Sequence, residues 1–220
     1  MEAVIEEKGE VEGLGEIFPV WQRSLCLQPN LRQAVKSYGA SYVAIALQWI
    51  SQAQVGVEAT VYFLKEFADQ VPENDRGKLF RIPVIKKNAE VCSRLLREVA
   101  RIPEKIKAEL IKVIVESKSP RLAFLTVYYN DKNPITREDK VRLLQVVFLV
   151  KEPEWAYLCC LAMAERAEGN LWQIPPEDKA MFHCLEAVVI GSKDKKWLFL
   201  FYRYVYGFPH AKAHFLAYGK

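Results

Sequence analysis

The chain has 220 residues, of which 51% are hydrophobic, 26% charged and 12% aromatic. This composition excludes a disordered chain, and ten glycines with eleven prolines are too few for a fibrous or low-complexity protein. The net charge of +4 is unevenly distributed, because residues 1–16 carry six glutamates and one lysine. We therefore expect an acidic flexible N-terminus at 1–16 and a single all-α domain over residues 17–220. The acidic terminus can stay solvated, or it can lie across a basic surface and compete with an anionic partner.

The chain lacks the features of an exported or membrane-spanning protein. A secretory signal begins with basic residues and an apolar core, whereas this N-terminus is acidic. The longest uninterrupted apolar stretch, residues 155–164, is far shorter than the roughly 20 residues of a membrane span. The five cysteines include no C-x-x-C pair, which argues against a zinc site or a disulfide framework. We expect a soluble cytoplasmic protein with the adjacent Cys159 and Cys160 buried.

The first elements along the chain are helical. Residues 43–54 and 57–71 are rich in alanine, leucine and aromatic residues and show no strand alternation, so they predict a helical hairpin that turns near residues 55–56. Breaks are expected where proline, glycine or asparagine cluster, at residues 28–30, 72–77, 130–134, 168–170 and 191–192. No β-hairpin signal is present, and the fold class is therefore all-α.

The second half contains an internal repeat. Its opening sequence, Ile102-Pro103-Glu104, recurs in part at Ile135 and at Ile174-Pro175. The clearest copies are residues 102–134, 135–173 and 174–210. A similar sequence at Arg81-Ile82-Pro83 predicts the opening of a preceding helix.

The copies also align internally. Lys118 matches Lys151 at an offset of 33, and Lys151 matches Lys193 at an offset of 42. The third copy begins at an offset of 39 and finishes at 42, which predicts one extra helical turn in its first helix. Each copy has the pattern of a helix, a short turn (K-S-P, K-E-P or K-D-K) and a second helix.

With this pattern, residues 102–210 resemble an α-solenoid of helical hairpins in the broad style of HEAT and TPR repeats. The resemblance covers about half of the chain and concerns architecture alone, because the TPR signature residues are not present in order. It implies stacked helical hairpins, a short α-solenoid preceded by an N-terminal helical region. It also implies a scaffold, since each hairpin adds a strip to one continuous binding surface.

A basic segment is the first candidate binding site. Residues 76–121 hold thirteen lysines and arginines against five acidic residues. Arg94, Arg97 and Arg101 are spaced by 3 and 4, so a helix would present all three on one face, and Lys105 follows them. Such a row can follow a phosphate backbone or contact a partner protein. The alternative is a solvated face with pairs such as Arg94–Glu98.

The C-terminal block, residues 191–220, is the second candidate. It contains nine aromatic residues and six lysines or arginines against the single Asp194. Aromatic rings among cations can stack bases or form a buried contact with a partner, for which Trp197, Tyr202, Arg203 and Tyr206 are the candidate residues. The alternative is that most of these rings pack inside the last repeat.

Catalytic and metal motifs are absent from the sequence. His210 and His214 are four residues apart, as metal ligands on a helix can be, but they lack the glutamate of an H-E-x-x-H site. His183 and Cys184 are neighbours and would point apart on a helix. No glycine-rich phosphate-binding loop is present. We expect no catalytic residues, no metal, no cofactor and no small-molecule substrate.

These observations favour a non-catalytic helical-repeat adaptor or subunit that binds another macromolecule, a protein, within a larger complex. The first alternative is a nucleic-acid-binding subunit of a nucleoprotein complex that uses its basic helix faces. The second is an enzyme whose site is assembled from scattered residues, such as a helical-repeat base-excision enzyme. No membrane partner is expected.

Overall fold

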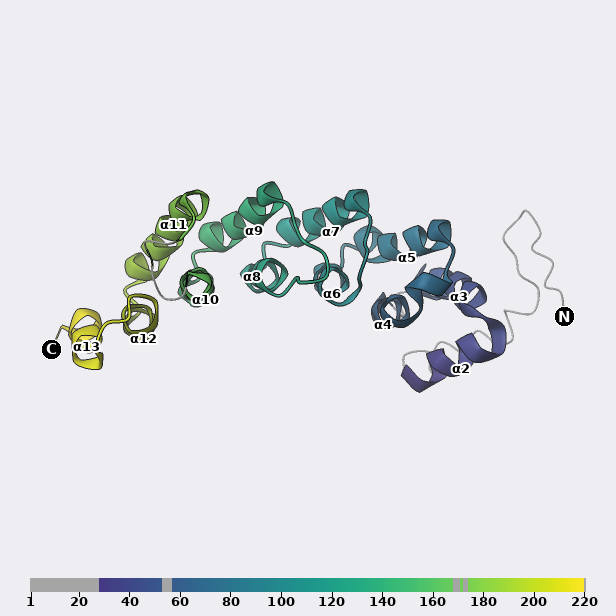
Figure 1. Ribbon diagram of the computed structural model, residues 1–220, viewed down its shortest axis with the longest axis horizontal. Helices are drawn as coiled ribbons and strands as arrows, with labels where there is room; N and C mark the ends of the chain where they lie inside the picture. The colour runs from purple at the N-terminus through teal and green to yellow at the C-terminus, as the bar shows by residue number, and fades with distance from the viewer. Residues whose placement is uncertain (1–27, 53–56, 168–170, 172–173, 220) are drawn as a thin grey trace.

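The computed structural model describes residues 28–52, 57–167, 171 and 174–219. Every regular element in these residues is helical, which confirms the all-α fold class (Figure 1). The helices are α2 (Gln28–Tyr38), α3 (Ala40–Gln52), α4 (Val57–Phe67), α5 (Glu73–Ile85), α6 (Ala89–Glu98), α7 (Glu104–Glu116), α8 (Pro120–Tyr128), α9 (Arg137–Val150), α10 (Pro153–Arg166), α11 (Pro176–Ser192), α12 (Lys195–Leu200) and α13 (His210–Tyr218). A 3-10 turn, η1 (Ala68–Gln70), follows α4, and a π-helical segment, η3 (Phe201–Val205), follows α12. The acidic N-terminus expected at 1–16 and the turn expected at 55–56 lie outside the described residues.

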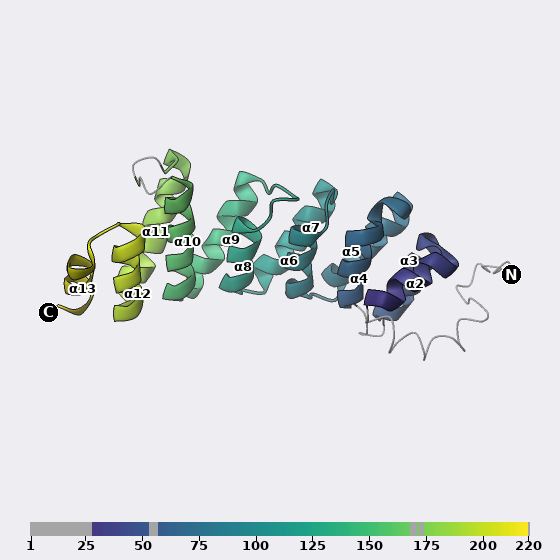
Figure 2. The same ribbon diagram turned by 60° about the horizontal axis from the view of Figure 1, so that its bottom comes forward.

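The helices lie in two rows along an elongated, arched molecule (Figures 1 and 2). Helices α4, α6, α8, α10 and α12 form the inner row, on the concave side of the arch. Helices α3, α5, α7, α9 and α11 form the outer row, and each helix also packs against the next one in its own row. The apolar core runs between the two rows and includes the fully buried side chains of Phe63, Phe80 and Phe201.

The closest helix pairs differ from the units that the repeat predicted. Helix α6 packs most extensively against α7, α8 against α9, and α10 against α11, although longer connections join these helices. The short K-S-P, K-E-P and K-D-K turns instead join α7 to α8, α9 to α10 and α11 to α12, which touch one another far less. Each short turn therefore carries the chain from the outer row of one pair to the inner row of the next. Turn length does not determine which apolar faces meet, so the repeat marks the helix–turn–helix units but not the helices that pack most extensively.

The short turns share one backbone conformation. Each of the outer-row helices α5, α7, α9 and α11 is followed within two residues by a lysine whose φ is positive, between 50° and 59°. We call these four residues the turn lysines: Lys87, Lys118, Lys151 and Lys193. The residue after each of these turn lysines is the N-cap of the next inner-row helix, and three of the four caps accept a backbone N–H hydrogen bond: Asn88, Ser119 and Asp194. An asparagine, serine or aspartate at this position satisfies a free N–H of the first turn. The aligned lysines of the sequence thus mark a repeated structural feature, and Lys87 extends the repeat by one copy toward the N-terminus.

The helix openings correct one prediction and confirm another. Pro83 lies inside α5, so Arg81-Ile82-Pro83 does not open a helix. The equivalent opening is Pro72, the N-cap of α5, just as Pro103 and Pro175 precede α7 and α11. The break predicted at residues 72–77 is therefore the first turn of α5. The extra helical turn in the third copy is confirmed, because α11 has 17 residues and α9 has 14.

Buried polar contacts connect successive helix pairs. The side-chain amide of Asn133 donates to the carbonyl oxygens of Leu96 and Val99, at 2.7 and 2.5 Å, and its oxygen accepts from the backbone N–H of Ile102 at 3.0 Å. Asn133 is 2% exposed and lies in the loop between α8 and α9. Its side chain therefore provides hydrogen-bond partners for backbone groups at the end of α6 and in the loop between α6 and α7. The hydroxyls of Ser93 on α6 and Thr126 on α8 are hydrogen-bonded at 2.9 Å and fully buried.

The predicted burial of Cys159 and Cys160 is confirmed, and Cys92 is buried as well, whereas Cys184 is exposed. Cys92, Cys159 and Cys160 are free thiols with no exposed surface. Burial raises the pKa of the Cys92 thiol to about 12, because the charged thiolate is poorly solvated there. These three cysteines therefore remain protonated and unreactive near neutral pH.

We expect Asn133→Ala to lower the free energy of unfolding by about 2 kcal/mol or more, because it leaves one N–H and two carbonyl groups buried without partners. The measurement is urea unfolding followed by circular dichroism. Asp131→Ala, at an exposed position of the same loop, is the matched control and should change stability by less than about 0.5 kcal/mol. Equal stability of the two variants would contradict the conclusion that the hydrogen bonds of Asn133 stabilise the contact between successive helix pairs.

Candidate partner-binding face

The predicted arginine row is divided by the structure. Arg94 and Arg97 lie on α6 in the inner row and are half-buried. Helix α6 ends at Glu98, and Arg101 follows it in the loop with a φ of 59° and a side chain that is 82% exposed. The three guanidinium groups therefore do not share one helix face, because the buried Val99 and Ile102 turn the chain toward α7. Lys105 lies on α7, in the outer row.

The predicted C-terminal residues are mostly engaged in packing. The half-buried Trp197 on α12 has its ring centroid 5.6 Å from that of Tyr157, and Tyr202 in η3 stacks on Phe208 at 6.2 Å. Arg203 donates to the carbonyl oxygen of Phe208 at 2.9 Å.

Tyr206 also belongs to the internal packing of this end. Its hydroxyl hydrogen-bonds a carboxylate oxygen of Glu186 on α11. Burial and this carboxylate raise the pKa of Tyr206, so the phenol stays protonated at neutral pH. Exposed aromatic area remains on this segment at Tyr204, whose exposed fraction is 58%.

The arginine row and the C-terminal block share one spacing from the turn lysines. The residues seven and ten positions after each turn lysine are all half-buried, and they occur on the four successive inner-row helices α6, α8, α10 and α12 with η3. We call these eight residues the inner strip: Arg94, Arg97, Leu125, Tyr128, Leu158, Leu161, Leu200 and Arg203. Arg97 and Arg203, which the sequence placed in separate candidate sites, thus occupy equivalent positions on one row.

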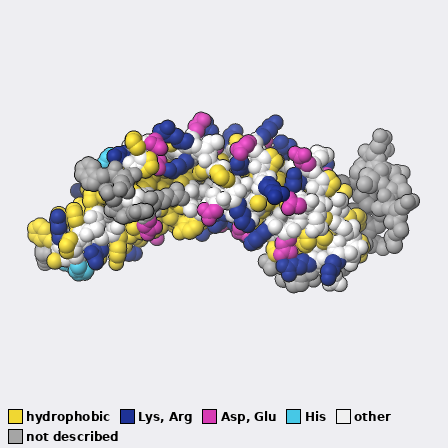
Figure 3. All heavy atoms as spheres, viewed as in Figure 1, with side chains coloured by type: hydrophobic (Ala, Val, Ile, Leu, Met, Phe, Trp, Pro, Cys, Tyr) yellow, Lys and Arg dark blue, Asp and Glu magenta, His cyan; other side chains and the backbone are white. Residues whose placement is uncertain are grey.

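The inner strip is apolar in its middle and cationic at both ends. Over α8 and α10 it consists of Leu125, Tyr128, Leu158 and Leu161, beside Tyr129 with an exposed fraction of 59%. Figure 3 shows hydrophobic side chains gathered over this part of the arch. These four residues are not among the predicted site residues, because apolar side chains at this spacing are typical of core positions. The signal that could have found them is the spacing from the turn lysines, which puts them at the positions that Arg94 and Arg97 occupy on α6.

The two arginines of α6 differ in their partners. Arg94 Nε lies 3.2 Å from Glu98 Oε1, and Lys65 Nζ lies 3.5 Å from Glu98 Oε2. Burial raises the pKa of Glu98, but the cations outweigh it and the pKa is lowered overall. In contrast, the Nε atom of Arg97 is buried without a hydrogen-bond partner among the described residues. Arg97 also forms no ion pair among the described residues, so the exposed part of its half-buried side chain is the cation of this end that an incoming acidic group can contact.

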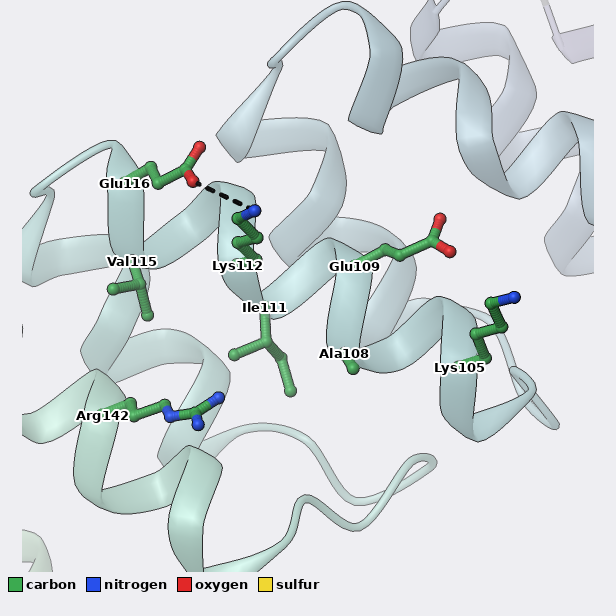
Figure 4. Close-up of a pocket in the computed structure, with 8 residues that line it drawn as sticks. All are labelled: Lys105, Ala108, Glu109, Ile111, Lys112, Val115, Glu116 and Arg142. Carbon is green, nitrogen blue, oxygen red and sulfur yellow. Dashed lines mark ion pairs between the residues drawn. The ribbon is translucent and has the colours of Figure 1, made fainter.

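The outer row carries a groove that is a weaker candidate. It has a volume of about 550 Å³ between α7 and α9, with Ala108, Ile111 and Val115 along its floor and charged residues at its rim (Figure 4). The rim charges compensate one another, because Lys112 pairs with Glu116 at 3.8 Å and Glu109 on α7 pairs with Arg81 at 3.2 Å. Lys105 lies at this groove, on the row opposite the inner strip. The groove offers apolar contact but no convergent polar groups for chemistry.

The histidines and acidic residues of the described part of the chain lie mostly apart from one another. No group of three or more metal-ligating side chains occurs there. His210 and His214 are exposed on α13 with ring centroids 6.2 Å apart, and His183 Nδ1 lies 3.1 Å from Glu186 Oε2. Across residues 28–52, 57–167 and 174–219, no helix has the length and hydrophobicity that a membrane span requires.

The chain matches no model of a known protein family, no curated protein and no solved structure. Any proposal on function therefore rests on the chemistry of this surface.

An ion network near the start of the inner row generates a prediction on pH. Arg32 on α2 binds Glu66 on α4 with Nε–Oε2 and Nη2–Oε1 distances of 2.8 and 2.5 Å, and Tyr62 donates to the same carboxylate at 2.7 Å. These hydrogen bonds lower the pKa of Glu66 to about 2.

Because the folded pKa of Glu66 lies below its unfolded value, its contribution to stability is present above about pH 4.5 and is lost as the pH falls toward 2. We expect Glu66→Gln to flatten the fall in stability over this interval, measured as the melting temperature at successive pH values. Glu109→Gln, at a surface pair on the outer row, is the control. Identical pH profiles for wild type and Glu66→Gln would contradict the assignment.

Proposed function

We propose that this protein is a short α-solenoid that acts as a non-catalytic adaptor and binds a partner protein along the inner strip. The observation that carries the proposal is the pattern of the strip, apolar over α8 and α10 and bounded by Arg97 at one end and Arg203 at the other. Repeat proteins of this shape present such a surface across successive helices. The concave position of the inner row supports a partner that lies along the arch (Figure 1).

The pattern specifies the chemistry of the partner segment. Leucines such as Leu125, Leu158 and Leu161 gain from contact with apolar side chains, whereas a nucleic-acid backbone needs cations along its whole length. The partner segment should therefore have apolar residues in its centre and acidic residues near its ends. Helices about 10 Å apart place α6 and α12 about 30 Å apart, which corresponds to roughly 9 extended residues or 20 helical ones.

One observation favours a nucleic-acid partner as the second candidate. Arg97 is a half-buried cation without an ion pair among the described residues, and Tyr129 and Tyr204 offer exposed rings on which bases can stack. Only one of the four helices of the strip, however, carries two cations at the strip positions. Nucleic-acid binding would show a steep dependence of affinity on salt, because each neutralised phosphate releases counterions.

The test compares two matched substitutions on opposite rows. Leu158→Glu with Leu161→Glu places two carboxylates in the centre of the strip, and Leu149→Glu places one on the outer row at a side chain that is already 71% exposed. Proteins captured from native extract by the wild type should be retained by Leu149→Glu and lost by the double variant. With a purified captured protein, we expect the double variant to bind at least tenfold more weakly, measured by calorimetry.

A nuclease-treated half of each extract separates the two candidates. Partners that persist after nuclease and depend on Leu158 and Leu161 support the adaptor. Partners that disappear with nuclease support the nucleic-acid alternative. If the double variant retains every partner while remaining folded by circular dichroism, the inner strip is not the binding surface and the proposal is wrong.

A further inference from the structure

The spacing from the turn lysines also places charged residues beside the inner strip. The residues three positions after the four turn lysines are Glu90 on α6, Arg121 on α8, Glu154 on α10 and Lys196 on α12. Glu90 and Arg121 form an ion pair, so side chains at this position contact one another across neighbouring inner-row helices. Lys196 lies four residues before Leu200 of the strip, a spacing that puts both on one side of α12. A lysine therefore lies beside the strip at its α12 end.

The cations at the α12 end of the strip have no carboxylate partner among the described residues. Lys196 is exposed, and its Nζ lies 4.3 Å from the ring centroid of Trp197. Arg203 donates one of its N–H groups to a backbone carbonyl oxygen, and its other N–H groups can accept a further partner. The single acidic residue of 191–220, Asp194, is occupied as the N-cap of α12. An acidic group can therefore bind at this end, next to the leucines of α10.

The residues that precede α2 have the composition that fits this surface. Residues 17–21 (I-F-P-V-W) are apolar, and residues 10–16 contain three glutamates and no lysine or arginine. From α2 toward the N-terminus, the chain is thus apolar first and acidic next. From α8 toward the C-terminus, the inner strip is apolar over α8 and α10 and cationic at α12. The segment and the surface therefore follow the same order.

The segment is also long enough to reach the matching parts of the surface. Arg32 on α2 binds Glu66 on α4 at 2.8 Å, so the start of α2 lies beside α4, on the side of the arch that carries the inner row (Figure 1). With about 10 Å between neighbouring helices, α8, α10 and α12 lie about 20, 30 and 40 Å from α4. At full extension the chain from α2 back to residues 17–21 spans at most about 25 to 40 Å, and back to residues 10–16 about 40 to 60 Å. The apolar residues can therefore cover α8 and α10 while the glutamates reach α12.

The covalent connection favours the chain's own segment over that of a second copy. A segment that is attached within reach of its site has an effective concentration on the order of a millimolar, whereas a second copy competes at its actual concentration. At micromolar protein concentration, the segment of the same chain therefore occupies the strip first.

We propose that residues 10–21 bind the inner strip of their own chain and regulate its access to partners. Residues 17–21 cover the apolar side chains of α8 and α10, and the glutamates contact Lys196 and Arg203. The inference rests on the proposed function, because the segment occupies the surface that is assigned there to a partner and must leave before a partner binds.

The composition of the segment also explains how a partner displaces it. Residues 17–27 contain no acidic residue, so Arg97 at the α6 end of the strip gains no ion pair from the segment. A partner with acidic residues near both of its ends gains this additional contact. The partner therefore binds more contacts of the strip than the segment does, and the segment selects against apolar ligands that lack the acidic ends.

The test places a photo-cross-linker in the segment of the 220-residue chain. Phe18→benzoylphenylalanine keeps an aromatic ring within the apolar residues, and ultraviolet light links this ring to the C–H groups that it contacts. Mass spectrometry of the monomer band should locate the cross-links on the strip residues of α8 and α10. Leu158→Glu with Leu161→Glu should lower the yield of these cross-links at least fivefold, because a carboxylate disfavours apolar contact.

Charge reversal tests the acidic half of the segment in the same assay. E10K/E12K/E16K should lower the yield of cross-links to the strip about fivefold or more, because lysines are repelled by the cations of α12. Adding K196E to this variant should recover part of the yield, since opposite charges again face each other. In the wild-type background K196E should lower the yield, whereas K105E, at an exposed lysine of the outer row, is the matched control and should leave it unchanged. Circular dichroism verifies that each variant is folded.

Cross-links that lie away from the strip overturn the proposal, as does a yield that the charge-reversed variants leave unchanged. Cross-links found in a dimer band mean binding between copies and also overturn it. The assay needs no partner, so its outcome is separate from that of the adaptor proposal. Cross-links on the strip without any captured partner would support this inference and contradict the adaptor. Partners that depend on Leu158 and Leu161, with the probe linked elsewhere, would support the adaptor and contradict this inference.

Discussion

The architecture depends on the reversal of the chain at the turn lysines. A lysine with positive φ follows each outer-row helix from α5 to α11 within two residues, and the next residue caps the following inner-row helix. This conformation is costly for a residue with a side chain, but it ends one helix and starts the next within about three residues. Because the reversal recurs with the same geometry, each inner-row helix begins at the same point in its pair. Its outward positions are then determined by counting from the lysine.

That register explains how one scaffold carries different surfaces. The positions seven and ten residues after the lysine hold arginines on α6, a leucine and a tyrosine on α8, and two leucines on α10. All are half-buried, so one part of each side chain packs against the core and the rest is open to solvent, where its identity shapes the surface. The adjacent inward positions are mostly apolar, with the hydrogen-bonded Ser93 and Thr126 as exceptions, because every helix must bury one side between the rows.

Successive pairs are joined by a few buried polar groups as well as by apolar packing. Asn133 binds three backbone groups at the end of α6 and in the loop after it, and the half-buried Lys140 on α9 binds both carboxylate oxygens of Asp178 on α11, at 2.8 and 2.6 Å. Such contacts require one geometry, unlike apolar contact, so they specify how each pair sits on the next. The same linear growth leaves two ends uncovered, and at the C-terminal end the uncovered residues are aromatic and basic.

The sequence by itself determined the helical class, the burial of Cys159 and Cys160, the extra turn of α11 and the alignment of Lys118, Lys151 and Lys193. These features follow from local composition and spacing, which a periodic pattern records directly. The sequence pattern wrongly predicted a helix opening at Pro83 and a shared helix face for Arg94 and Arg101. Both errors concern helix ends, which depend on the apolar residues that are buried in the core of the folded protein. Only the tertiary structure decided that α8 packs more extensively on α9 than on α7, and that Arg97 and Arg203 occupy equivalent positions of one row. Packing between rows is set by contacts between residues far apart in the chain, and no local pattern contains them.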